Sequence, residues 1–164
     1  MKKLLLLGLM FCAVDVGAEN MEVVGRVESK CVITPDTSGF YGNPTPQKLD
    51  SDPTSGGVDP VVRYDVLQAN FYKAKISYPI AWSESPTLSD TVTWVGDVET
   101  SEVSVAGMSA YNAAKVEYDN HTEFNLTLAG STWFKTETNA TYGVGKAFPA
   151  GNYRAVVVAE CIAQ

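Results

Sequence analysis

Two cysteines near opposite ends of the chain, Cys31 and Cys161, are the residues whose chemistry depends most on their positions. In an exported chain they most simply form one disulfide, because that compartment is oxidising. Two free thiols or an intermolecular bond are the alternatives. A Cys31–Cys161 bridge would close a loop of 130 residues, worth about 5 kcal/mol in the chain-entropy model. It requires the first and last strands to be neighbours.

The start of the chain predicts export. Residues 1–18, MKKLLLLGLMFCAVDVGA, carry Lys2 and Lys3, a short apolar run over 4–14, and small residues at 16–18. This is the layout of a cleaved signal peptide. A retained anchor is the alternative, but the run is shorter than the roughly 20 residues that span a bilayer. Cleavage would remove Cys12 and leave residues 19–164, a suitable length for a single domain. We expect the chain to be secreted.

The charge pattern argues against nucleic acid as a partner. The chain has a net charge of −7, and loss of Lys2, Lys3 and Asp15 with the leader makes it −8. Acidic residues are scattered singly and no basic patch occurs, so anionic lipid is also a poor partner. No later segment is apolar for long enough to span a membrane.

Candidate catalytic residues are few. His121 is the one histidine in the chain, and no G-x-S-x-G nucleophile elbow accompanies it. Zinc sites need several Cys or His ligands. We therefore predict a surface histidine and no enzyme, with a hydrolase that uses His121 as a weaker alternative.

Aspartates and aromatic residues offer two further possibilities for binding. Asp50, Asp52 and Asp59 could give oxygen ligands to calcium, but their spacing is not that of a helix–loop–helix site. Aspartates that form turns fit better, and we predict no metal and no cofactor. A sugar-binding face could use aromatic side chains, although strand aromatics more often pack inside a sandwich. The candidates are Tyr64, Trp82, Trp94, Trp133 and Tyr142.

Alternation of apolar and polar residues predicts an all-β fold. Strand patterns occur over residues 21–33, 61–78, 91–98, 102–105, 123–128 and 153–162, with a Gly-Asp turn expected near Gly96. Residues 35–60 are rich in Pro, Gly, Ser and Asp and predict one long loop with several turns. A short helix is expected over 108–118. The strand spacing favours an antiparallel sandwich over a barrel.

The two ends resemble bacterial fimbrial and spore-coat-U-like secreted pilus subunits. The segment VVGRVESKCVIT, residues 23–34, is similar to their first strand, and FPAGNYRAVVVAEC, residues 148–161, to their last. The resemblance implies an immunoglobulin-like sandwich that lacks its final strand. It also implies an apolar groove that the N-terminal extension of a neighbouring subunit fills by strand addition.

The resemblance also implies positions for this groove. Val23, Gly25 and Val27 would line the first strand, Tyr153 would belong to the last strand, and Val156 and Val158 would face the groove. If residues 21–27 form the first strand, only residues 19–22 precede it, a stub that reaches at most ~14 Å. The chain would then accept a strand without giving one, unless residues 21–27 are themselves the donor.

The preferred interpretation is a secreted, non-enzymatic subunit of a surface fibre or pilus. Its partners would be other copies of itself or related fibre subunits, and an assembly chaperone in the periplasm. The alternative is a self-contained secreted module that binds a carbohydrate or protein, with the residues 40–60 loop and nearby aromatics as its recognition surface.

Overall fold

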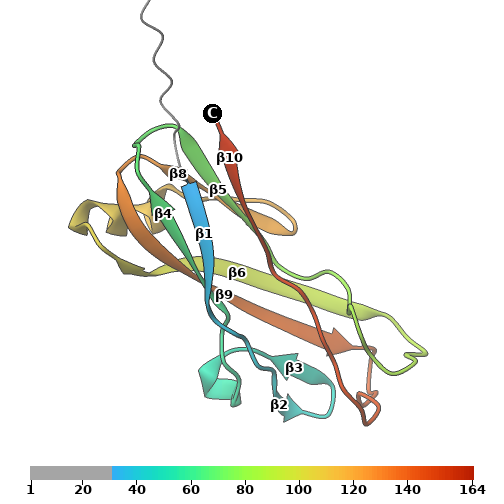
Figure 1. Cartoon of the computed structure of the whole chain (residues 1–164). Helices are drawn as coiled ribbons and strands as arrows, with labels where there is room; N and C mark the ends of the chain where they lie inside the picture. The colour runs from blue at the N-terminus through green and yellow to red at the C-terminus, as the bar shows by residue number, and fades with distance from the viewer. Residues whose placement is uncertain (1–30) are drawn as a thin grey trace, which may run out of the picture.

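The computed structural model describes residues 31–164, which form two antiparallel sheets packed face to face (Figure 1). The six-stranded sheet contains β1 (Cys31–Thr37), β2 (Gly42–Thr45), β3 (Lys48–Asp50), β4 (Val61–Val66), β6 (Val92–Val103) and β9 (Gly130–Tyr142). The four-stranded sheet contains β5 (Tyr72–Ser77), β7 (Val116–Glu117), β8 (His121–Leu126) and β10 (Val158–Ala163). Short helical segments are η1 (Pro53–Ser55), η2 (Ala106–Ala110) and α1 (Tyr111–Ala114). In this part of the chain no helix is long and apolar enough to cross a membrane.

Strand β9 organises the larger sheet. One of its edges pairs with β4 and then with β3, and its other edge pairs with β6 along nearly the whole strand. Strand β1 pairs with β4 and ends this sheet. In the smaller sheet the order is β10-β5-β8-β7, so that β10 is also a terminal strand. The first and last strands of the described chain are therefore both sheet edges.

The core lies where the inner faces of the two sheets meet. Along β9 every second side chain is buried, as the alternation of a half-buried strand requires. Phe134 of β9 packs its ring 4.4 Å from Phe124 of β8 and 5.5 Å from Tyr64 of β4, measured between ring centroids. All three are at most 1% exposed. These ring contacts join the two sheets.

The prediction of an all-β antiparallel sandwich is confirmed. The predicted helix over 108–118 is right in place but too long. Helical backbone covers η2 and α1 and ends at Ala114, because the backbone of Lys115 is extended, and residues 116–117 form β7.

The predicted turn at Gly96 is wrong. Strand β6 runs through this position without interruption and shifts register only between Thr100 and Glu102. Glycine is required here by packing, because the ring of Tyr78 lies against it and a Cβ would stand 2.3 Å from that ring. The glycine marks a close approach, which is its other common role in a strand.

The segment predicted as a long loop, residues 35–60, is largely structured. It completes β1, forms the β2–β3 hairpin and contains η1, with a bridge between Phe40 and Val58. Asp52 caps η1, since its Oδ1 accepts a hydrogen bond of 2.6 Å from the backbone N–H of Thr54. The composition of this segment predicts its turns correctly. It does not predict the short strands that these turns connect.

The ends of the chain differ from the expected strands. Strand β10 begins at Val158, and residues 151–157 form only an isolated bridge between Arg154 and Glu84. The predicted leader and the first-strand positions Val23, Gly25 and Val27 lie outside the described residues.

Candidate functional site

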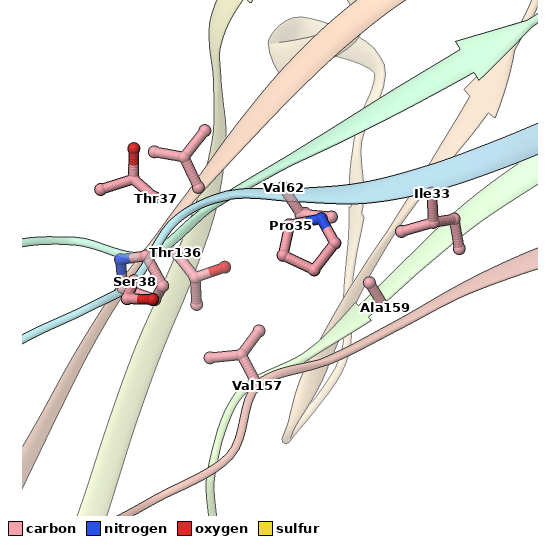
Figure 2. A pocket seen from close by; sticks show the side chains of 10 residues that line it. Ile33, Pro35, Thr37, Ser38, Val62, Thr136, Val157 and Ala159 are labelled. Carbon is pink, nitrogen blue, oxygen red and sulfur yellow. The ribbon is translucent and has the colours of Figure 1, made fainter.

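A groove runs between the two terminal strands. Its first hollow, of about 410 Å³, is lined by Ile33 and Pro35 of β1 and by Val157 and Ala159 opposite (Figure 2). Adjoining hollows of about 440 and 400 Å³ continue it between residues 38–41 and residues 151–157. We call this feature the terminal groove. Its walls are residues 33–41 and 151–159.

The terminal groove opens onto the hydrophobic core. Val62, a core residue that is 9% exposed, lines it together with Ile33, Val157 and Ala159. These last three pack against the core but are only partly buried. A sandwich core that is left partly uncovered along one side is an apolar surface that a partner can cover.

The two walls differ as hydrogen-bonding edges. Within the described chain, neither β1 nor β10 has a hydrogen-bonded neighbour on its outer side, so both present unpaired backbone groups. On the β1 wall, Pro35 has no N–H, and the pairing of this strand with β4 is irregular between Pro35 and Thr37. The opposite wall, residues 151–159, contains no proline. The C-terminal wall is the better template for an added strand.

A buried hydroxyl without a partner lines the first hollow of the terminal groove. Thr136 of β9 is 1% exposed and lines the first hollow, between Ser38 and Val157 in Figure 2. Its Oγ1 has no hydrogen-bond partner among residues 31–164. An unpaired buried hydroxyl costs about 1–3 kcal/mol, so a polar group brought into the groove would be stabilised there.

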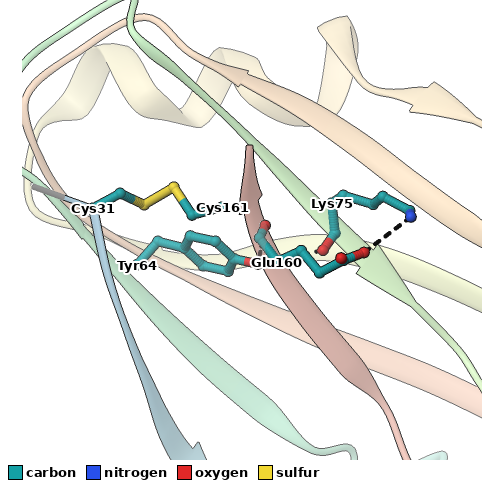
Figure 3. Close-up of a disulfide and its surroundings, with 5 residues drawn as sticks. All are labelled: Cys31, Tyr64, Lys75, Glu160 and Cys161. Atoms are coloured by element: carbon teal, nitrogen blue, oxygen red, sulfur yellow. Dashed lines mark hydrogen bonds and ion pairs between the residues drawn. A yellow bond between two sulfur atoms is a disulfide. The ribbon is translucent and has the colours of Figure 1, made fainter. Parts of the chain in front are cut away.

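A disulfide closes one end of the terminal groove. Cys31 at the start of β1 is bonded to Cys161 of β10, with their Cα atoms 6.4 Å apart (Figure 3). This confirms the predicted pairing.

Beside the disulfide, the Tyr64 hydroxyl donates to the backbone carbonyl of Glu160 at 3.0 Å and so links β4 to the other sheet. Burial, and then the nearby charge of Glu160, raise the pKa of Tyr64, which keeps this hydroxyl protonated as a donor.

On the opposite side of the sandwich, side chains join the two sheets. Lys115 forms ion pairs with Asp97 of β6 at 2.6 Å and with Glu117 of β7 at 2.8 Å, and thereby joins the two sheets. Lys115 also donates to the carbonyl of Val98, and Asn112 accepts from the N–H of Thr100. Side chains thus cap the free edge of β6, whereas the edges at the terminal groove are left open.

A substitution at Gly96 tests the close packing of β6 against Tyr78. Gly96→Ala places a methyl group into the ring of Tyr78, and we expect it to lower the free energy of unfolding by about 2 kcal/mol, as overpacking does. Urea denaturation measures the change. Val95→Ala alters the neighbouring side chain, which is 56% exposed, and should have a much smaller effect. Equal effects of the two substitutions would contradict the close packing.

The predicted groove residues fall in different places. Tyr153 lines the third hollow, and Val156 lies between the second hollow and a separate surface depression beside Ile80. Val158 lines only that separate depression and is 48% exposed. The first hollow of the groove is lined by the other phase of the segment, Val157 and Ala159. Cys161 could have indicated which of the two alternating sets of residues faces the groove. Because its side chain reaches across to Cys31, the residues that share its face, Ala159 and Val157, must also point inward.

His121 and the loop aspartates are used structurally. The ring of His121 stacks on Tyr118 at 4.4 Å. Asp59 accepts a 2.6 Å hydrogen bond from the hydroxyl of Ser51, and Asp50 accepts from the hydroxyl of Ser55. Burial alone would raise the pKa of Asp50, but hydrogen bonds, the first from Lys48, lower it. Among residues 31–164, no group of three or more Cys, His, Asp or Glu side chains is placed to hold a metal ion.

Burial and nearby acids make the contribution of Glu137 to stability depend on pH. Burial, followed by the charges of Asp52, Asp59 and Asp50, raises the pKa of Glu137 above 4.5. A carboxyl with a raised pKa favours the fold when protonated, so its contribution is lost as pH rises through the raised value. Glu137→Gln should therefore raise the midpoint of thermal unfolding by about 2 °C at pH 7 and leave it unchanged at pH 3.

Asp90 gives a control of opposite sign for that prediction. A hydrogen bond from Lys146 lowers the pKa of Asp90, so its contribution is present at neutral pH and is lost in acid. Asp90→Asn should lower the thermal midpoint at pH 7. An increase for both variants would show that removal of negative charge in general, and not local repulsion at Glu137, controls the effect.

The aromatic residues considered for a sugar-binding face are mostly engaged with one another or with the core. Tyr64 is fully buried. Trp82 packs 4.5 Å from Trp94 and 5.0 Å from Tyr153, and Tyr142 stacks on Phe148. Trp133 is the exception, since it lies on the outer side of β9 with the guanidinium of Arg63 5.7 Å from its ring. Most of these rings serve as packing.

In comparisons with known proteins, no family model, no curated protein and no solved structure matched this chain.

Proposed function

We propose that the protein is a secreted, non-enzymatic subunit of a cell-surface fibre, which associates by accepting a strand from another subunit into the terminal groove. The observation that carries this proposal is the pair of unpaired sheet edges, β1 and β10, on either side of an apolar opening to the core. Backbone hydrogen bonds to an edge supply affinity in strand addition, and alternate side chains that enter pockets supply specificity.

The contrast between the two sides of the sandwich supports the same function. Natural sheets normally protect their edges with charges, prolines or covering segments. This fold does so at β6, through Lys115 and Asn112, and leaves the C-terminal wall unprotected. The terminal groove is also long in one direction, as an extended segment requires.

Size and stability of the exported chain test the proposal. We expect assemblies larger than a monomer by light scattering, and a higher thermal midpoint when a peptide of residues 19–30 is added to dissociated chains. The control is a peptide of the same composition in scrambled order. A fully stable monomer that is indifferent to the peptide would contradict the proposal and favour the self-contained binding module.

A further inference from the structure

We propose that the second and third hollows of the terminal groove bind a sugar residue that carries a carboxylate. The two hollows, of about 440 and 400 Å³, lie within the usual size range of small-ligand pockets. They adjoin, because Phe40, Tyr41 and Arg154 line both of them. The site lies within one chain, so this inference goes beyond the proposed function and does not rest on strand addition.

Arg154 supplies the group that binds the anion. It is exposed, and within residues 31–164 it is the one lysine or arginine side chain without an ion pair. The planar guanidinium can donate two parallel hydrogen bonds to one carboxylate, a geometry that lysine does not offer. Because this unpaired arginine lines both hollows, it is available to a ligand anion that enters either of them.

The backbone at Arg154 is held in place while its side chain is left unpaired. Its N–H donates to the carbonyl of Glu84 at 2.8 Å, and its carbonyl accepts from the N–H of Ser83 at 2.8 Å. The hydroxyl of Ser83 donates to the same carbonyl at 3.0 Å. A binding residue whose backbone is already fixed loses less conformational entropy when the ligand arrives.

The charges around the two hollows favour a ligand with a single carboxylate. No Asp or Glu of the described chain lines either hollow, so no neighbouring acid competes there for Arg154. The protein as a whole carries a net charge of −7, which repels polyanions such as nucleic acids and polyphosphates. One arginine in an acidic protein matches one negative charge on the ligand.

A sugar hydroxyl has a partner on the floor of the second hollow. Thr138 lines this hollow and is 3% exposed. Its backbone N–H donates to the hydroxyl of Ser51 at 2.9 Å, but its own Oγ1 has no hydrogen-bond partner in the part of the chain that the structure describes. A buried hydroxyl left unpaired costs about 1–3 kcal/mol, and a ligand hydroxyl that reaches it removes part of this cost.

Aromatic rings beside the hollows favour a sugar over an acidic peptide. Phe40 is 64% exposed and lines both hollows, and Tyr153 lines the third. One face of a sugar ring carries mainly C–H groups, which pack against the apolar face of an aromatic ring. A peptide carboxylate would pair with Arg154 but would bring no ring of hydroxyls to Thr138. The combination of groups therefore fits an acidic sugar.

Isothermal titration calorimetry on the dissociated exported chain tests this site. The probes are 3′-sialyllactose and cellobiouronic acid, which each carry one carboxylate on a different kind of sugar. The control ligands are their methyl esters, which keep the rings and remove the charge. We expect at least one of the acids to bind about tenfold or more tightly than its ester, since a hydrogen-bonded charge pair is lost in the ester. Equal affinities of acid and ester, or no binding of either acid, would overturn the proposal.

Substitutions at Arg154 test its role directly. Arg154→Gln should weaken binding of the acid about tenfold and leave binding of the ester unchanged. Arg154→Lys should lose less, because it keeps the charge without the planar fork. Lys135→Gln is the matched control, since it removes the same charge from the outer side of β9, and it should change the affinity by less than about twofold. Equal losses for Arg154→Gln and Lys135→Gln would overturn Arg154 as the anion-binding group.

Thr138→Val separates binding from folding. Valine has a similar shape without the hydroxyl, so we expect the free energy of unfolding to stay the same or rise, while acid and ester both bind about threefold more weakly. Unchanged binding would overturn Thr138 as a ligand partner. An acidic peptide, triglutamate, that binds as tightly as the saccharides would overturn the sugar as the ligand. Light scattering reads assembly separately, so the proposed function can fail while this site stands, and the reverse.

Discussion

Replacing Val157 by Arg is expected to reduce the assembled fraction of the exported chain at least tenfold. Val157 lines the terminal groove and packs against the core from its rim. An inserted strand would bury the guanidinium without a partner, and an unpaired buried charge is costly. In the free subunit the same side chain can extend into water, because long basic side chains keep their charged end solvated. The measurement is the size distribution by analytical ultracentrifugation.

Val158→Arg is the matched control for this result. Val158 is the next residue along the chain and is 48% exposed, and its side chain lines a separate depression instead of the hollows of the terminal groove. The charge added is identical, so a general effect of charge on solubility appears in both variants. Equal loss of assembly in the two variants would contradict the terminal groove as the site where a strand is accepted. Thermal unfolding of each monomer shows whether the Val157→Arg variant is simply misfolded, and we expect a shift within about 1 kcal/mol.

Removing the disulfide is expected to give the largest loss of stability. The Cys31→Ser and Cys161→Ser double variant frees a loop that spans 130 residues, and loss of a native disulfide typically costs about 2–5 kcal/mol. The thermal midpoint should fall by roughly 10 °C or more. After the bridge is lost, β10 is still held by its ladder with β5, by the ion pair of Glu160 with Lys75 and by the hydrogen bond from Tyr64.

Urea denaturation of the double variant measures this loss, and wild-type chain under reducing conditions provides the comparison. The two samples should agree, because both lack the same constraint. An unchanged midpoint would show that the bridge is stabilising neither the ends of the chain nor the groove.

The sequence predicts the sheets and the disulfide better than it predicts the surfaces they create. Alternation along β4, β5 and β8 reflects burial on one face, a physical property that a single segment carries by itself. The Cys31–Cys161 pair followed from the number of cysteines and the oxidising compartment expected for an exported chain. Both signals are independent of how the strands are connected.

The face of the last strand was harder to assign. Valines occupy both phases of residues 156–158, so apolar character cannot distinguish the groove side from the outer side. Only the direction of Cys161 does so, through Ala159 and Val157. Gly96 misled for a related reason, because glycine serves both turns and close approaches, and the approaching ring of Tyr78 is distant in sequence.

Hydrogen exchange at the C-terminal wall tests strand addition most directly. The backbone N–H groups of residues 155–160 would be compared between assembled and dissociated chains, with β9 as an internal reference that stays paired in both. We predict strong protection of alternate amides at 155–160 in the assembled state and rapid exchange of the same amides after dissociation. Rapid exchange at these amides in intact assemblies would contradict the addition of a strand at this edge.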